Sequence, residues 1–124
     1  MKQIAVVEDN ADNRLLIQAV LGDQYEVVEY ADGPTALAGM AATTPDLVLL
    51  DISLPGMDGI EVLVRLRQVD ALRCLPVVAL TAHAMAGDRE RFMAAGFDEY
   101  VSKPIVDLDA LSALVAGLLQ RSAG

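Results

Sequence analysis

Side chains able to do chemistry stand at the carboxyl ends of short apolar runs, at four separate points of the sequence. These side chains are Glu8, Asp9, Asp51, Thr81 and Lys103. Three carboxylates brought close together repel one another unless a positive charge lies among them. Mg²⁺ suits such a place, because it prefers hard oxygen ligands, keeps several waters and often binds beside phosphate. The residue types therefore indicate a magnesium site that handles a phosphoryl group.

Each of the remaining groups has a chemical part in that hypothesis. Asp51 would be the nucleophile that accepts the phosphoryl group. Lys103 would donate to a phosphoryl oxygen as a point charge. The Thr81 hydroxyl can hydrogen-bond a phosphoryl oxygen that is absent before the reaction, which would make it a sensor of the product.

Each residue also has a plainer interpretation when taken alone. An Asp after a strand is usually a helix cap or a turn residue, and a Lys or Thr there is usually a surface group. The Glu8-Asp9-Asn10 segment could simply cap the first helix. The functional interpretation depends on the joint placement of these residues at four strand ends.

Five apolar runs alternate with segments of helical period and are predicted to be strands. The runs are Ile4–Val7, Tyr25–Tyr30, Leu47–Leu50, Val77–Leu80 and Tyr100-Val101. Continuous aliphatic runs are typical of strands covered on both faces, and Glu26 and Glu29 favour an edge position for the second run. Parallel strands need helical crossovers, so the pattern predicts an α/β domain with a doubly wound parallel sheet. In such a sheet ligands bind beyond the carboxyl ends of the strands.

Five helices are expected between and after these strands. The first is predicted over Asn13–Leu21, the second opens at Gly33-Pro34 and the third is capped by Asp58. The fourth is expected from about Met85 to Ala95, with Gly96 as its C-terminal stop. The last begins near Asp107.

Four segments together resemble the response-regulator receiver domains (CheY-like) of two-component signalling, over nearly the full length. The segments are Val6–Asn10, Leu49–Gly59, Leu80–Ala82 and Ser102–Pro104. The resemblance implies a flavodoxin-like, CheY-like sheet of order 2-1-3-4-5 and a cis Lys103-Pro104 bond. It implies one receiver domain over residues 1–124, which catalyses only its own phosphorylation and dephosphorylation and is otherwise no enzyme.

The resemblance also implies a role for each matching residue. Asp51 would accept the phosphoryl group from a sensor histidine kinase or a histidine phosphotransfer protein. Asp9 and Asp51 would bind Mg²⁺ through carboxylates, Ser53 through its backbone carbonyl, and Glu8 through a bound water. Thr81 and Tyr100 would form the switch that changes the surface of helix four, strand five and helix five for a downstream protein target. Glu8 departs from the family pattern, since many members have Asp there.

Composition limits the remaining possibilities for this chain of 124 residues. A formal net charge of −9 argues against nucleic-acid binding. Cys74 is the single cysteine, which excludes an internal disulfide and a multi-cysteine zinc site. The absence of a signal peptide or a membrane-length apolar run points to the cytoplasm and away from a membrane.

Three other functions of this fold remain as alternatives. They are a binding module that works without phosphorylation, an aspartyl-phosphate hydrolase and a flavin-binding domain. Ser53 stands where the hydrolase would usually have a second carboxylate, and Glu8-Asp9 would repel a flavin phosphate. The chain could be a single-domain regulator, a phosphorelay intermediate or a receiver excised from a hybrid kinase, and Met1 directly before the first strand favours a complete chain. His83 is expected to be a surface loop residue, and Gly87 is expected to keep the fourth helix soft.

Overall fold

The computed structural model describes residues 1–82, 88–103, 105 and 107–123. The expectations for His83, for Gly87 and for the bond to Pro104 lie outside these residues. So does the expected start of the fourth helix near Met85.

Five parallel strands form one sheet in the order β2-β1-β3-β4-β5. The strands are β1 (Gln3–Val7), β2 (Glu26–Tyr30), β3 (Leu47–Asp51), β4 (Val77–Thr81) and β5 (Glu99–Ser102). The predicted α/β class, the doubly wound topology and the order 2-1-3-4-5 are confirmed. The mixed run at Glu26–Tyr30 is indeed an edge strand, with its two glutamates exposed.

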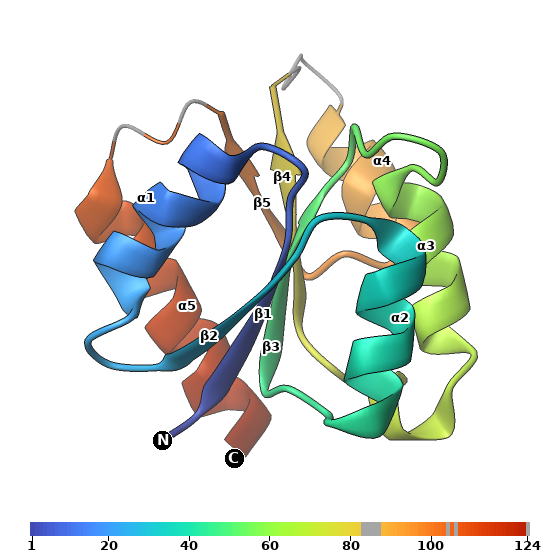
Figure 1. Ribbon diagram of the computed structural model, residues 1–124, viewed down its shortest axis with the longest axis horizontal. Helices are drawn as coiled ribbons and strands as arrows, with labels where there is room; N and C mark the ends of the chain where they lie inside the picture. The colour runs from blue at the N-terminus through green and yellow to red at the C-terminus, as the bar shows by residue number, and fades with distance from the viewer. Residues whose placement is uncertain (83–87, 104, 106, 124) are drawn as a thin grey trace.

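In the part of the chain that the structure describes, five helices cover both faces of the sheet. They are α1 (Ala11–Leu21), α2 (Gly33–Ala42), α3 (Gly59–Arg67), α4 (Asp88–Ala95) and α5 (Leu108–Ala123), with a short 3-10 turn η1 at Asp70–Leu72. In Figure 1, α1 and α5 lie on one face of the sheet and α2, α3 and α4 on the other. The amino end of β1 and the carboxyl end of α5 lie close together, on the side away from the carboxyl ends of the strands.

Local signals explain where several helices begin and end. The Asn10 side chain accepts hydrogen bonds from the backbone N–H groups of Asp12 and Asn13, so α1 begins at Ala11, two residues before the predicted start. Asp58 accepts from the Glu61 N–H at 2.9 Å and caps α3 as predicted. Directly after α4, Gly96 has φ +114°, a left-handed conformation that glycine adopts without strain.

The core consists of two apolar layers, one on each side of the sheet. Every residue of β3 and β4 is buried, which matches their continuous aliphatic sequences. On one side Phe92 of α4 packs edge-on against Phe97, with ring centroids 6.1 Å apart. On the other side Ile17 of α1 and Val115 of α5 are fully buried. These layers fix β3 and β4 between them, and with these strands the residues at their carboxyl ends.

Arg67, at the end of α3, joins several segments at the amino end of the sheet. Its guanidinium donates to the backbone oxygens of Leu75 (2.5 Å) and Gly96 (3.0 Å). It also pairs with the Asp98 carboxylate at 3.3 Å. The same carboxylate accepts from the Val77 N–H at 2.8 Å, at the start of β4. These contacts join α3, β4 and the α4–β5 connection far from the strand ends that carry the carboxylates.

Candidate functional site

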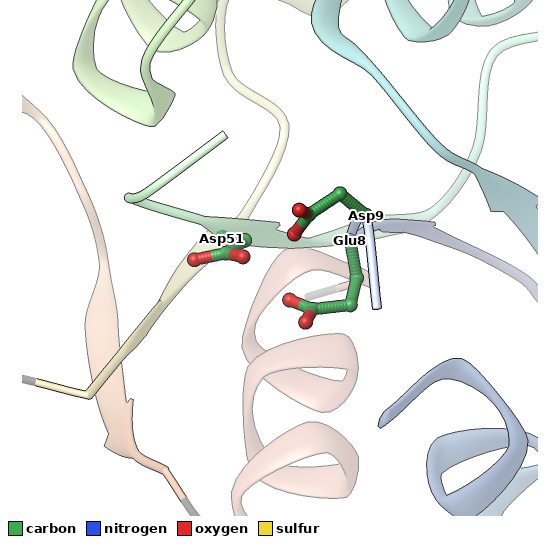
Figure 2. Close-up of side chains that lie close together, drawn as sticks. All are labelled: Glu8, Asp9 and Asp51. Carbon is green, nitrogen blue, oxygen red and sulfur yellow. The ribbon is translucent and has the colours of Figure 1, made fainter. Parts of the chain in front are cut away.

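Three carboxylates meet at the carboxyl ends of β1 and β3. Val7 pairs with Leu50 in the sheet, so the residues that follow, Glu8 and Asp51, lie beside each other. One carboxylate oxygen from each of Glu8, Asp9 and Asp51 lies within 4.8 Å of the others. Figure 2 shows the three side chains turned toward one another. Glu8 and Asp51 are buried and Asp9 is exposed, so the group opens to solvent on one side.

Lys103 supplies the positive charge that this group of carboxylates needs. Its Nζ lies 3.1 Å from Asp51 Oδ2 and 3.3 Å from Glu8 Oε2. The backbone of Lys103 is fixed as well, because its N–H donates to the carbonyl of Thr81 at 2.7 Å. One ammonium group among three carboxylates leaves an excess of negative charge. The oxygen donors and this charge fit a hard divalent cation such as Mg²⁺.

The ionisation of Glu8 and Asp51 differs although the two are neighbours. Burial raises the pKa of Glu8, and its contact with Asp51 acts in the same direction. Burial also opposes the ionisation of Asp51, but hydrogen bonds from Glu8, Ser53 and Lys103 outweigh it and lower the pKa of Asp51. Burial disfavours the Lys103 ammonium, yet its bond to Asp51 raises the pKa of Lys103 above the ordinary value. Without a metal, therefore, Asp51 ionises more readily than usual and Glu8 less readily.

This difference predicts a pH effect on the stability of the metal-free protein. Because the pKa of Glu8 is higher in the folded chain than its ordinary value of 4.5, the folded chain holds that proton more tightly. The tighter binding of this proton stabilises the folded chain fully below pH 4.5, and the stabilisation is lost as the pH rises through the folded pKa of Glu8. The free energy of unfolding then falls by at most about 1.4 kcal/mol per pH unit. The Glu8→Gln variant should lack this loss. Urea unfolding in EDTA from about pH 4.5 to about pH 8 measures the difference, and curves that stay parallel would contradict it.

The other residues singled out in the sequence lie around this group. Ser53 is exposed, and its N–H donates to Asp51 Oδ1 at 2.9 Å, so its backbone lies beside the carboxylate. Thr81 is buried at the end of β4, the strand next to β3. Tyr100 of β5 is half-buried, with its ring 6.0 Å from that of Phe92 in α4. Ser53 and Thr81 thus lie at the carboxyl ends of the strands, whereas Tyr100 pairs with Ala79 further back along β4. The roles of these residues in a reaction remain predictions.

Comparison with known proteins gives the family. A model of the response regulator receiver domain matches residues 4–116. The chain belongs to this family. The polar-differentiation response regulator DivK of Brucella anthropi is 42% identical over 105 residues, which are 84% of this chain and 85% of DivK. The histidine-protein kinase BarA of Shigella flexneri is 42% identical over 103 residues, 82% of this chain but only 11% of BarA.

Solved structures agree with this assignment. The receiver domain of the sensor histidine kinase PA1611 from Pseudomonas aeruginosa superposes with a TM-score of 0.87 at 33% identity, over 96% of this chain and 98% of that chain. That structure is described with a magnesium ion coordinated in its active site cleft. The chemotaxis protein CheY4 of Vibrio cholerae superposes with a TM-score of 0.88 at 25% identity, over 95% and 98% of the two chains. The predicted receiver fold is therefore confirmed.

Two residues of α1 in this receiver domain contact the site and were missed from the sequence. Asn13 Nδ2 donates to Glu8 Oε1 at 2.8 Å. Arg14 Nη1 donates to the Glu8 carbonyl at 2.7 Å, while its Nε pairs with Glu29 of β2 at 3.1 Å. The available signal was their spacing, since residues five and six positions after Glu8 fall on the first turn of the following helix. From the sequence they were expected only to begin that helix.

The receiver domain also requires a glycine beside the proposed acceptor. A Cβ on Gly59 would meet the carbonyl oxygen of Asp51 and lie 2.7 Å from the Cα of Ile52. The Gly59 N–H donates to the Ile52 carbonyl at 2.9 Å. The first turn of α3 thus lies directly against the backbone that carries Asp51, and a larger residue would push the two apart. No helix in the described part of the receiver domain is long and apolar enough to cross a membrane.

Proposed function

We propose that this receiver domain, taken as residues 1–124, accepts a phosphoryl group on Asp51 from a phosphohistidine donor. The donor would be a sensor histidine kinase or a histidine phosphotransfer protein. The observation that carries the proposal is the joint placement of Glu8, Asp9 and Asp51 within 4.8 Å, with Lys103 paired to two of them. Asp51 is the acceptor in this proposal because it is the ionised, buried carboxylate that Lys103 contacts most closely.

The chemistry is an in-line displacement at phosphorus. An Asp51 carboxylate oxygen forms a bond to phosphorus as the bond from phosphorus to the donor histidine nitrogen breaks, and the nitrogen keeps the electron pair. Lys103, already 3.1 Å from Asp51, would donate to a transferring phosphoryl oxygen. Asp9, Asp51 and the Ser53 carbonyl would hold Mg²⁺, with Glu8 acting through a water. When bound, Mg²⁺ neutralises negative charge that otherwise opposes transfer.

Phosphorylation would then act as a switch. The phosphoryl group adds roughly −1.5 to −2 charge and three strong acceptor oxygens. A hydrogen bond from Thr81 and the pull of Lys103 would draw in the end of β4. Tyr100 would follow and change the α4–β5–α5 surface for a protein partner. The effect is a shift between two states, limited by how much better the phosphoryl group fits one of them.

Two kinds of relative support a role in signalling. DivK, of which this chain covers 85%, is named a response regulator. BarA is named a histidine-protein kinase and GacS of Pseudomonas syringae a sensor protein, and the match spans 11% and 12% of their lengths. A single-domain regulator that binds a target protein is our first candidate. A phosphorelay intermediate, or a receiver within a hybrid kinase, is the second and uses the same acceptor site.

The test is the intact mass of the chain after incubation with acetyl phosphate, in Mg²⁺ or in EDTA. We expect a single phosphoryl adduct in Mg²⁺ and none in EDTA, because the uncompensated carboxylates repel the donor phosphate. A phosphohistidine donor should give the same pair of results. If neither donor modifies the chain in Mg²⁺, the proposal is wrong and a binding module that works without phosphorylation is favoured.

A further inference from the structure

We infer that Asn13 is a positioning residue that aims the Glu8 carboxylate at the water through which it would act on Mg²⁺, and that this receiver domain needs it because residue 8 is Glu. The inference rests on the proposed Mg²⁺-dependent function and deepens it. Its basis is the hydrogen bond of 2.8 Å from Asn13 Nδ2 to Glu8 Oε1.

Asn13 itself is firmly held. It lies on the first turn of α1, where its backbone N–H donates to the capping side chain of Asn10 at 3.1 Å. The next residue, Arg14, fixes the Glu8 backbone through the Glu8 carbonyl at 2.7 Å. The Glu8 N–H in turn donates to the carbonyl of Tyr30 at 3.0 Å. With both backbones fixed, the remaining freedom lies in the Glu8 side chain.

Both oxygens of Glu8 lie within hydrogen-bond distance of Lys103 Nζ, and Oε1 has a second and closer donor in Asn13. Oε1 accepts from Asn13 at the short distance of 2.8 Å, while Lys103 Nζ lies 3.3 Å from Oε2 and 3.4 Å from Oε1. A Glu side chain has one more rotatable bond than an Asp side chain, so its carboxylate can adopt more positions. Lys103 already contacts both oxygens, so without Asn13 that ammonium alone would orient the carboxylate, which could then rotate away from the position it needs beside the metal site. The Asn13 hydrogen bond fixes the orientation of the Glu8 carboxylate before the metal binds.

A neutral donor suits this position better than a charged one. The Asn13 amide orients Glu8 without adding a second positive charge to that of Lys103, so the three carboxylates keep the excess of negative charge that attracts a cation. A Lys or Arg at position 13 would pair with Glu8 and compete with Mg²⁺. Groups that orient the ligands of a metal site without touching the metal typically change its affinity by about 10–100-fold when removed.

The first experiment measures Mg²⁺ affinity by calorimetry on the metal-free chain with Asn13→Leu and Asn13→Ala. Leu resembles Asn in size but has no donor, and both Leu and Ala form helices more readily than Asn, so α1 is not weakened. We expect Mg²⁺ to bind roughly tenfold more weakly in both variants. Gln18→Ala, further along α1, is the matched control and should bind Mg²⁺ as the wild type does. Circular dichroism checks that each variant is folded. If only one of the two Asn13 variants folds, that variant is compared with the wild type.

The second experiment repeats Asn13→Leu in the Glu8→Asp background. An Asp carboxylate lies one C–C bond, about 1.5 Å, nearer its backbone, out of reach of the Asn13 amide. The loss of Mg²⁺ affinity should then shrink to less than about twofold. A merely structural role of Asn13 would give the same loss in both backgrounds and would overturn the inference alone. A wild-type chain that binds no Mg²⁺ would overturn the inference together with the proposed function.

Discussion

The Asp51→Asn variant will take up no phosphoryl group from acetyl phosphate or from a phosphohistidine donor. The substitution keeps the size of the side chain but replaces the ionised oxygen that attacks phosphorus with a neutral amide. Asp51 is 1% exposed and contacts Lys103 and the Ser53 N–H, so no neighbouring side chain can replace it in the same position. Intact mass in the presence of Mg²⁺ measures the outcome directly.

Asp58→Asn is the matched control for the Asp51 substitution. Asp58 caps α3 through the Glu61 N–H, and Asn is as good a capping residue as Asp. The control removes the same charge from the segment that follows β3 but should keep the fold and the phosphoryl adduct. An adduct that survives in Asp51→Asn at the wild-type level would place the acceptor elsewhere in the chain.

The Lys103→Met variant should lose both stability and phosphoryl transfer. Its loss leaves Glu8 and Asp51, both buried, without their cation. Removing one partner of a buried ion pair costs about 3–5 kcal/mol, and the open side of this site reduces that to about 2–3 kcal/mol in the metal-free chain. Transfer from acetyl phosphate should fall by about a hundredfold or more, because no ammonium remains beside the transferring oxygens.

Chemical denaturation in EDTA and in Mg²⁺ separates the two effects of Lys103→Met. We expect Mg²⁺ to restore much of the lost stability by supplying charge to the same carboxylates, while transfer remains slow. Lys2→Met removes an exposed lysine directly before β1, at the opposite end of that strand from Glu8, and should change neither quantity. If Lys103→Met unfolds at the wild-type denaturant concentration in EDTA, the ion pairs contribute nothing to stability and this account of Lys103 is wrong.

The sequence was enough to predict the strands and which side chains their carboxyl ends bring together. Continuous aliphatic runs define the length of each strand within a residue or two, and parallel pairing then places Glu8 beside Asp51. The cap residue Asp58 was also accessible, because the capping preference is local. Gly96 behaved as expected for the same reason.

Contacts that depend on side-chain direction could not be predicted in the same way. Asn13 and Arg14 belong to a helix whose start was placed two residues late, so the side of α1 facing Glu8 was not known. The acceptors of Arg67 lie up to 31 residues away, in loops whose shape no local pattern determines. The pKa difference between Glu8 and Asp51 depends on burial and on individual hydrogen bonds, neither of which a sequence states.

The placement of the two ends of the fold has a practical consequence for handling the protein. The start of β1 and the end of α5 lie together on the side away from the carboxyl ends of the strands, as Figure 1 shows. An affinity tag or a biotin at either end would therefore immobilise the domain on a sensor chip with its carboxylates facing the solution. A donor kinase could then approach the bound domain as it would approach the free one.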